Sequence, residues 1–291
     1  MTNWLVTGGA GFIGTHLCRA LNARGDDVRV LDDLSNSNRF PPDVDVIQGD
    51  VTDAGDLADA LEGVDGCFHL AAVQPNPQGD RCGAFRTNVG GLVALLYAAS
   101  KLAICPIVYA SSAAIYGNAS ADCRVRETAY PKPISAYGAE KLCGEVLASV
   151  GNHVQATGLR LFNVYGPGCH GVVANFRDSI LRGEAVEICG DGRQTRDFIH
   201  VSDVVAALMA AMGVEWPGAL NVCTGQPTSI LTLAAMMAAI TNRPLGLRHV
   251  PDRAGDIRYS SGSPDLFRRV LGLGEPMALN DGLAAYLSDG I

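Results

Sequence analysis

Close to its N-terminus the chain reads Trp4-Leu5-Val6-Thr7-Gly8-Gly9-Ala10-Gly11-Phe12-Ile13-Gly14. The apolar residues before the glycines predict a buried strand, and those after Gly11 predict a helix. Gly8 would allow a tight turn, Gly11 a close approach of the backbone to a pyrophosphate, and Gly14 the packing of helix on strand. The positive end of the helix dipole would attract the phosphate charge. We therefore expect a dinucleotide-binding βαβ unit here. The alternative is a glycine turn without a ligand.

Two carboxylate positions extend this expectation. A second expected strand, residues 28–32, ends at Asp32 and Asp33, about 20 residues after the glycines. A carboxylate at this point accepts hydrogen bonds from the ribose 2′-hydroxyl and repels a 2′-phosphate, which favours NAD over NADP. Asp50 closes the third expected strand, residues 44–48, where it can bond the adenine edge. A turn residue or helix cap is the alternative for such an aspartate.

Further short apolar runs at residues 67–71 and 107–111 alternate with helical stretches such as 12–23 and 89–100. Strands of this kind, without clean polar alternation, are typical of parallel strands covered on both faces. After about residue 161 the alternation is less regular. The expected fold is an α/β Rossmann-type doubly wound parallel sheet with a smaller α/β C-terminal substrate lobe. We assign residues 1–165 to an NAD-binding domain, to which about 190–210 return, and 166–291 mainly to the lobe.

Composition excludes several classes of function. The net charge of −8 in 291 residues argues against nucleic acid as the main partner, because phosphate backbones favour a basic face. Nine dispersed cysteines without a C-x-x-C pair predict reduced thiols, and the histidines do not cluster with them, so no metal site is expected. The apolar runs are too short to span a bilayer, and the first expected strand leaves no room for a signal peptide. We expect a cytoplasmic protein that binds no membrane.

Ser112, Tyr137 and Lys141 form the candidate catalytic set. Tyr137 and Lys141 are four residues apart and share one face of an expected helix. Free tyrosine titrates near pH 10, and a neighbouring ammonium and a positive nicotinamide ring both favour the phenolate that a base requires. Ser112 follows the fifth expected strand and can donate a hydrogen bond to a substrate oxygen. A tyrosine and lysine at this spacing alone more often mark a solvated helix face, but their order after the strand-end serine favours catalysis.

With these motifs the sequence resembles the extended short-chain dehydrogenase/reductase family, and within it the UDP-glucose 4-epimerase group. The similarity runs nearly end to end. It includes residues 7–14, 31–37, 68–72, 88–90, 111–117, 137–141, 159–167, 196–201 and 253–256.

The resemblance implies site residues beyond those argued above. Further cofactor contacts would come from the matching motifs, namely Phe12, Ile13, Asn36, Ser37, Val51, Leu70, Ala71, Ala72, Asn88 and Ser111, together with Tyr137 and Lys141. Substrate contacts would come from Ser112, from Asn163, Arg196 and Arg253 at a diphosphate, from Asp256 at the nucleotide ribose, from Val173 in a segment similar to one that lines the sugar pocket, and from Ser260. His200 is expected to be structural.

The residues after Ser112 select among the reactions of the family. Related sugar-nucleotide 4,6-dehydratases and decarboxylases carry an acidic residue two positions after the Ser/Thr, whereas this chain has Ala113 and Ala114. Water elimination requires an acid and a base near C5 and C6, which alanines do not offer. The resemblance therefore implies an isomerase: NAD-dependent C4 epimerisation of a nucleoside-diphosphate sugar through a transient 4-keto intermediate. A 4-ketoreductase of NDP-4-keto-6-deoxyhexoses is the alternative, and a non-catalytic NAD-binding regulatory protein is a remote one.

The substrate stays open between UDP-glucose/galactose and the N-acetylhexosamine equivalents. Ser260 falls where a bulky tyrosine restricts some epimerases to sugars without an N-acetyl group, so a serine would admit them. The loop at residues 74–82 matches no pattern of the family, and Leu161 stands where epimerases usually have tyrosine. The resemblance also implies a homodimer, with an interface built from helices at residues 89–100 and 137–150.

Overall fold

Seven parallel strands form the central sheet of the computed structural model, which describes residues 2–35, 40, 43–74, 79–104, 106–121, 123–150, 154–253 and 255–288. The spatial order is β10-β6-β5-β4-β1-β2-β3. Their bounds are β1 Asn3–Thr7, β2 Asp27–Asp32, β3 Asp45–Gln48, β4 Gly66–His69, β5 Ile107–Ser112, β6 Ala156–Leu161 and β10 Gly218–Val222. Parallel pairing of every neighbouring pair confirms the predicted Rossmann-type sheet.

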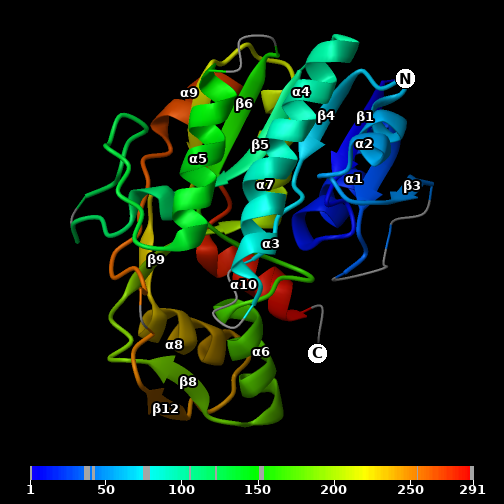
Figure 1. Cartoon of the computed structure of the whole chain (residues 1–291). Coiled ribbons are helices and arrows are strands. Elements are labelled where there is room, and N and C mark those ends of the chain that lie inside the picture. The colour runs from blue at the N-terminus through cyan, green and yellow to red at the C-terminus, as the bar shows by residue number, and fades with distance from the viewer. Residues whose placement is uncertain are drawn as a thin grey trace.

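Helices cover both faces of this sheet, as the apolar character of its strands requires. On one face α1 (Phe12–Arg24) packs against α7 (Val201–Ala211), and α9 (Asp265–Leu271) packs against α7 and β10. On the other face lie α2 (Ala54–Leu61), α4 (Leu92–Leu102) and α5 (Ala136–Val150), the last two side by side in Figure 1. Each face buries its own apolar cluster against the sheet.

Local sequence explains where these helices begin and end. The Asp53 carboxylate accepts hydrogen bonds from the backbone of Gly55 and Asp56 and caps α2. Gly25 ends α1 in the left-handed region, with φ of 85°. The predicted helix at 89–100 is α4 preceded by α3 (Arg81–Phe85) and a π-helical turn, η1 (Arg86–Gly91). A short 3-10 turn, η2 (Ala113–Tyr116), follows β5.

A smaller lobe lies below the sheet in Figure 1. It contains α6 (Val172–Arg182), α8 (Ile230–Ile240), α10 (Leu279–Ser288) and the parallel pair β8 (Val186–Cys189) and β12 (Leu247–Val250). A three-stranded sheet of β7 (Asn163–Tyr165), β9 (Thr195–His200) and β11 (Pro227–Ser229) accompanies it. Phe176, Phe198 and Met237 belong to its separate core.

The chain after residue 165 does not stay in this lobe. The strand β10 is part of the central sheet, and the helices α7 and α9 pack on that sheet. The segments at 201–222 and 265–271 therefore belong to the NAD-binding domain in space. We predicted that residues of about 190–210 return to the NAD-binding domain, and the second half of this range lies in α7. Within the described ranges, no helix combines the length and apolarity needed to cross a membrane.

Candidate active site

The glycine turn lies between β1 and α1 at the carboxyl edge of the sheet. Gly8 has a φ of 71°, and a Cβ there would lie 2.6 Å from the backbone nitrogen of Ala71. A Cβ on Gly14 would meet the carbonyl oxygen of Gly8 and lie 2.7 Å from the Cα of Gly9. Gly11 is the N-cap residue of α1 and provides no side-chain cap, and the first turn of the helix carries no acidic residue. Backbone N–H groups and the positive end of the helix thus meet in a cradle without side chains, which suits a pyrophosphate.

Asp32 is held firmly beside this cradle. Its carboxylate accepts hydrogen bonds from the backbone N–H of Ala10 at 3.0 Å and of Leu34 at 2.9 Å. Burial raises the pKa of Asp32, while those two N–H groups lower it. The neighbouring Asp33 accepts instead from the backbone and hydroxyl of Ser35. An oriented carboxylate at the end of β2 fits a ribose hydroxyl donor.

One cavity collects most of the predicted cofactor residues that the structure describes. Asp50 and Val51 belong to its lining, and Asp50 accepts hydrogen bonds from both the backbone and the hydroxyl of Thr52. Its lining includes Gly8, Gly11, Asp32, Asp33, Asp50, Val51, Leu70, Ala71 and Ala72. Asn36 and Ser37 lie outside the described residues.

The remaining predicted cofactor residues lie deeper. Phe12 and Ile13 start α1 and pack against the core cluster of that face. The amide of Asn88 is occupied: it bonds the N–H and carbonyl of Val73 and donates to Glu140 at 2.7 Å. The Ser111 hydroxyl donates to the buried carboxylate of Glu145. The side chains of Asn88 and Ser111 therefore hold other parts of the protein in place.

Ser112, Tyr137 and Lys141 meet between the end of β5 and the first turns of α5. The Ser112 hydroxyl accepts from the backbone of Ala114 at 3.1 Å, and it also hydrogen-bonds Tyr137. Lys141 donates to the carbonyl of Ala110 at 2.9 Å, and its Nζ lies 5.7 Å from the centre of the Tyr137 ring. The three side chains thus occupy one site, as their order in the sequence predicts.

Burial dominates the ionisation of this set. It raises the pKa of Tyr137 to about 12, and the hydrogen bond with Ser112 opposes that rise. Burial also lowers the pKa of Lys141 to about 8, with the charge of Glu140 opposing the shift. The protonated Lys141 ammonium beside the ring favours the phenolate of Tyr137, whereas the charge of Glu140 raises the pKa of Tyr137.

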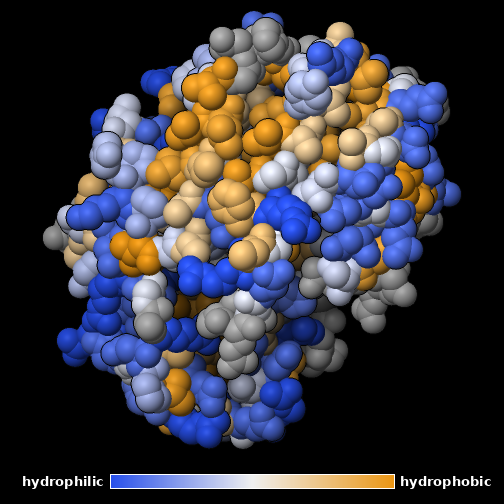
Figure 2. Space-filling model, viewed as in Figure 1, coloured by the Kyte–Doolittle hydropathy of each residue, from blue (hydrophilic) through white to orange (hydrophobic). Residues whose placement is uncertain are grey.

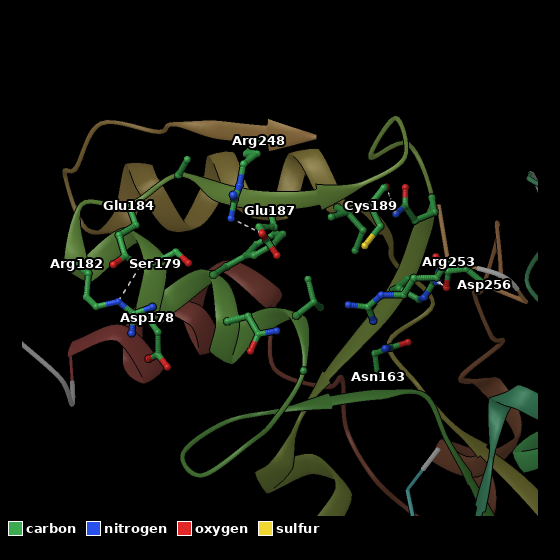
Figure 3. Close-up of a pocket in the computed structure, with 18 residues that line it drawn as sticks. Asn163, Asp178, Ser179, Arg182, Glu184, Glu187, Cys189, Arg248, Arg253 and Asp256 are labelled. Carbon is green, nitrogen blue, oxygen red and sulfur yellow. Dashed lines mark hydrogen bonds and ion pairs between the residues drawn. The ribbon is translucent and has the colours of Figure 1, made fainter. Parts of the chain in front are cut away.

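One cavity opens from this site, and a second cavity adjoins it in the lobe. The first is lined by Ser112 and Tyr137, by the alanines after Ser112, and by Ser260. The second, drawn in Figure 3, runs between α6 and β8 in the lobe. Both are lined by Asn163, Arg196, Arg253 and Asp256. The residues predicted to hold a diphosphate and a ribose therefore stand where the two cavities meet.

Charge at this junction is only partly paired. Arg196 forms an ion pair with Asp256 at 2.6 Å and donates to the carbonyl of Thr195. Arg253 is exposed, lines both cavities and has no ion-pair partner among the residues described. Guanidinium groups in such a place suit phosphate oxygens, which they bind with two parallel hydrogen bonds.

Of two further residues predicted to contact the substrate, one lies in the core of the lobe and the other lines a cavity. Val173 is buried in the core of the lobe with Phe176, and its neighbours Gly171 and Val172 line the second cavity instead. Ser260 is mostly buried, lines the first cavity, and donates its backbone N–H to Thr195. His200 caps α7 through its ring nitrogen, which accepts from the backbone of Ser202.

Sequence reasoning missed several polar residues that line the cavities. Arg86 and Glu140 line the first cavity, where the unmatched loop at 74–82 adds Gln74, Gly79, Asp80 and Arg81. Residues 75–78 of that loop lie outside the described ranges. The second cavity adds Cys189 and Gln194. The residues of this loop show no spacing that indicates a ligand. The only sign in the sequence was that the loop at 74–82 does not match the family pattern.

Comparisons with known proteins agree with this geometry. The NAD dependent epimerase/dehydratase family matches residues 4–223. A UDP-glucose 4-epimerase of Mycolicibacterium smegmatis is 36% identical over 96% of both chains. The UDP-glucose 4-epimerase of Thermotoga maritima, solved with UDP-glucose, superposes with a TM-score of 0.93 at 32% identity, covering 99% of this chain and 98% of that one. The enzyme of the same name from Thermus thermophilus, solved with NAD, gives 0.92 at 31% identity, with 99% and 98% covered.

The chain belongs to the NAD-dependent epimerase/dehydratase family. The predicted resemblance to extended short-chain dehydrogenases/reductases and to UDP-glucose 4-epimerases is confirmed. NAD is the cofactor. Gly8 and Gly11 line the cavity that fits its pyrophosphate, Gly14 lets α1 approach the backbone of that turn, and Asp32 in the same cavity fits its adenosine ribose.

Proposed function

We propose that this protein is an NAD-dependent 4-epimerase that inverts C4 of a UDP-sugar through a transient 4-keto sugar. The observation that carries the proposal is that Ser112 and Tyr137 line one cavity together with Ala113 and Ala114, with Lys141 beside the Tyr137 ring. A base and an oxygen-binding hydroxyl are present there, but the acid that dehydration requires is absent from those two positions. The relatives named above support the same reaction.

Each side chain of the site has a defined task. Bound NAD supplies the hydride chemistry at C4. Tyr137 takes the proton of the C4 hydroxyl and later returns it to the oxygen of the other epimer. Ser112 donates a hydrogen bond to that oxygen, and Lys141 holds Tyr137 in its anionic form. Lys141 is buried behind the other two, whereas Ser112 and Tyr137 are partly buried and line the cavity that would receive the sugar.

Inversion requires the keto sugar to turn while its nucleotide stays fixed. Arg196 and Arg253 would hold the diphosphate at the junction of the cavities, and Asn163 and Asp256 lie beside them. Beyond this junction the cavity in Figure 3 would receive the nucleoside. On the other side the small side chains of Ala113, Ala114 and Ser260 leave the sugar free to present either face.

Arg253 gives a direct test of the anchor. We expect Arg253→Gln to raise KM for the UDP-sugar about 10- to 100-fold, because a hydrogen bond to a charged group contributes about 1.5–3 kcal/mol. The kcat should change little, since Tyr137 and Ser112 are untouched. Steady-state kinetics would measure both, with Arg243→Gln at an exposed position as control. An unchanged KM would remove Arg253 from the anchor.

Ser260 tests the range of sugars. We expect the wild-type protein to turn over UDP-N-acetylglucosamine as well as UDP-glucose. Ser260→Tyr should lower kcat/KM for the N-acetylated sugar about 10- to 100-fold, because overfilling a packed site costs about 1–3 kcal/mol. Turnover of UDP-glucose should persist in the variant. Wild-type turnover of UDP-glucose but not of UDP-N-acetylglucosamine would contradict this assignment.

The proposed reaction itself is tested by following purified protein with a panel of UDP-, dTDP- and GDP-sugars by NMR. We expect the C4 epimer to appear at equilibrium with UDP-sugars, with no net formation or consumption of NADH. Stoichiometric NADH or NADPH consumption with a 4-keto-6-deoxy sugar would instead identify a ketoreductase. Cofactor binding without any turnover would identify a regulatory protein.

We also propose that the protein works as a homodimer. Figure 2 shows an apolar area on the face where α4 and α5 lie side by side. Its exposed members are Val93, Tyr97, Leu102, Val146, Leu147 and Val150. A clustered apolar face of this kind is typical of an interface, and two such helix pairs would form a four-helix contact.

Breaking this face should produce a monomer. We expect Val146→Asp to shift the protein from dimer to monomer in analytical ultracentrifugation, because each copy would bury an unpaired carboxylate in the contact. Val146 is half exposed in the single chain, so the fold itself should tolerate the change. Leu247→Asp, at an exposed position of β12 in the lobe, serves as the control. A wild-type monomer at micromolar concentration would refute the proposal.

A further inference from the structure

A buried ion pair lies directly behind the catalytic residues. Glu145 of α5 and Arg160 of β6 are joined at 2.8 Å, and both side chains are about nine-tenths buried. The Nε of Arg160 also donates to both oxygens of the same carboxylate, at 3.0 and 3.2 Å. The contact is therefore multidentate, which fixes the relative orientation of the two planar groups.

The pair connects to every element that carries a catalytic side chain. Glu145 lies four residues after Lys141 and eight after Tyr137, so the three residues project from nearly the same face of α5. Its carboxylate accepts the hydroxyl of Ser111, which immediately precedes Ser112 on β5. Ser111 is also the register partner of Arg160 between β5 and β6.

Arg160 extends the connection to the wall beyond Ser112. It donates to the hydroxyl of Tyr116 at 2.6 Å and to the carbonyl of Glu127 at 3.2 Å. Tyr116 ends η2, the turn that begins with Ala113, and its hydroxyl donates to Asn221 of β10 at 2.7 Å. One guanidinium thus joins the base-bearing helix to the turn that contains Ala113 and Ala114.

From these contacts we infer that Glu145 and Arg160 are positioning residues, which set the distance and angle between Tyr137 on α5 and Ser112 at the end of β5. The inference rests on the proposed epimerase function. Neither residue lines the cavities described above, so they act on the substrate only through Ser112, Tyr137 and the turn after Ser112.

A purely structural role explains this pair poorly. Taking two charges out of water is costly, and apolar replacements of a buried ion pair are often neutral or stabilising. Stability alone would therefore be served as well by two apolar side chains. A multidentate link with fixed angles offers what apolar packing lacks, namely a defined orientation for the groups attached to it.

The test replaces both partners together, since removing one would leave a buried charge and destabilise the fold. In the double variant Glu145→Met/Arg160→Met we expect kcat for UDP-glucose to fall about 10²-fold, the cost of a displacement of about 1 Å in a catalytic group. KM, bound NAD per chain and Tm should stay near their wild-type values. Arg160→Lys keeps the positive charge but loses the two-pronged guanidinium contact. Its kcat should therefore lie between those of the double variant and the wild type.

The matched control is a second ion pair far from the site. Arg268→Met/Glu275→Met removes the more exposed pair beside α9 and should leave kcat unchanged. Wild-type kcat in the Glu145→Met/Arg160→Met variant would overturn the inference. So would a parallel loss of kcat, bound NAD and Tm, because that pattern indicates general damage. If the wild-type protein lacks epimerase activity, the proposed function fails first, which separates the two outcomes.

Discussion

Replacing Tyr137 by phenylalanine is expected to lower kcat for UDP-sugar epimerisation about 10²- to 10⁴-fold, the usual contribution of a positioned acid–base group. The variant keeps the ring and its packing but has no proton to exchange with the C4 oxygen. Burial raises the pKa of the Tyr137 hydroxyl to about 12, so this group needs the neighbouring Lys141 and Ser112 to work near neutral pH. Bound NAD should remain at the wild-type level.

The measurement combines kinetics with cofactor content. The epimer ratio is followed by NMR, and NAD is quantified after the protein is denatured. Tyr130→Phe is the matched control, because Tyr130 is 90% exposed and lines none of the described cavities. Unchanged turnover in Tyr137→Phe would remove Tyr137 as the base and leave Ser112 as the remaining hydroxyl of the set.

Gly14→Ala is expected to abolish NAD retention and with it the activity. The added Cβ would meet the Gly8 carbonyl oxygen and lie 2.7 Å from the Cα of Gly9. Both neighbours are backbone atoms of the phosphate-binding turn, so α1 must move away from it. Overpacking of this kind costs about 1–3 kcal/mol of folding free energy, and it also misplaces the N–H groups that would face the pyrophosphate.

Gly274→Ala provides the control for this substitution. Gly274 is exposed, and no atom lies within 4 Å of the Cβ that it would gain. It should keep wild-type NAD content and Tm, as measured by cofactor release and by thermal unfolding. Full NAD occupancy in Gly14→Ala would show that the close contact between Gly14 and Gly8 is dispensable for the cofactor.

Much of the fold was predictable because its signals are local. The glycine spacing, the apolar runs and their alternation with helical stretches predict the strand–helix order, and the parallel sheet confirms it. The order of strands after residue 165 was less accessible. Gly218–Val222 pairs beside β6 across more than fifty intervening residues, and no local pattern encodes such a contact.

The residues of the site also fall into those that local sequence predicts and those that depend on tertiary contacts. Tyr137 and Lys141 are related by helix geometry alone, and Ser112 by its place at a strand end, so the sequence was sufficient to group them. By contrast, Asn88 and Ser111 carry motif signatures, yet their side chains bond Val73, Glu140 and Glu145. A motif marks a position, and only the packing around it determines where the side chain points.

The glycines of residues 8–14 with Asp32 indicated the cofactor class, and Ser112, Tyr137 and Lys141 indicated acid–base chemistry, because each depends on spacing within one element or on the end of a strand. Tertiary structure alone decided three other features. It brought Arg196, Arg253 and Asp256 to the junction of two cavities, it placed Arg81 and Arg86 in the catalytic cavity, and it joined Glu145 to Arg160 behind the base. Those residues meet only when separate segments of the chain pack against one another, and such packing leaves no periodic trace in the sequence.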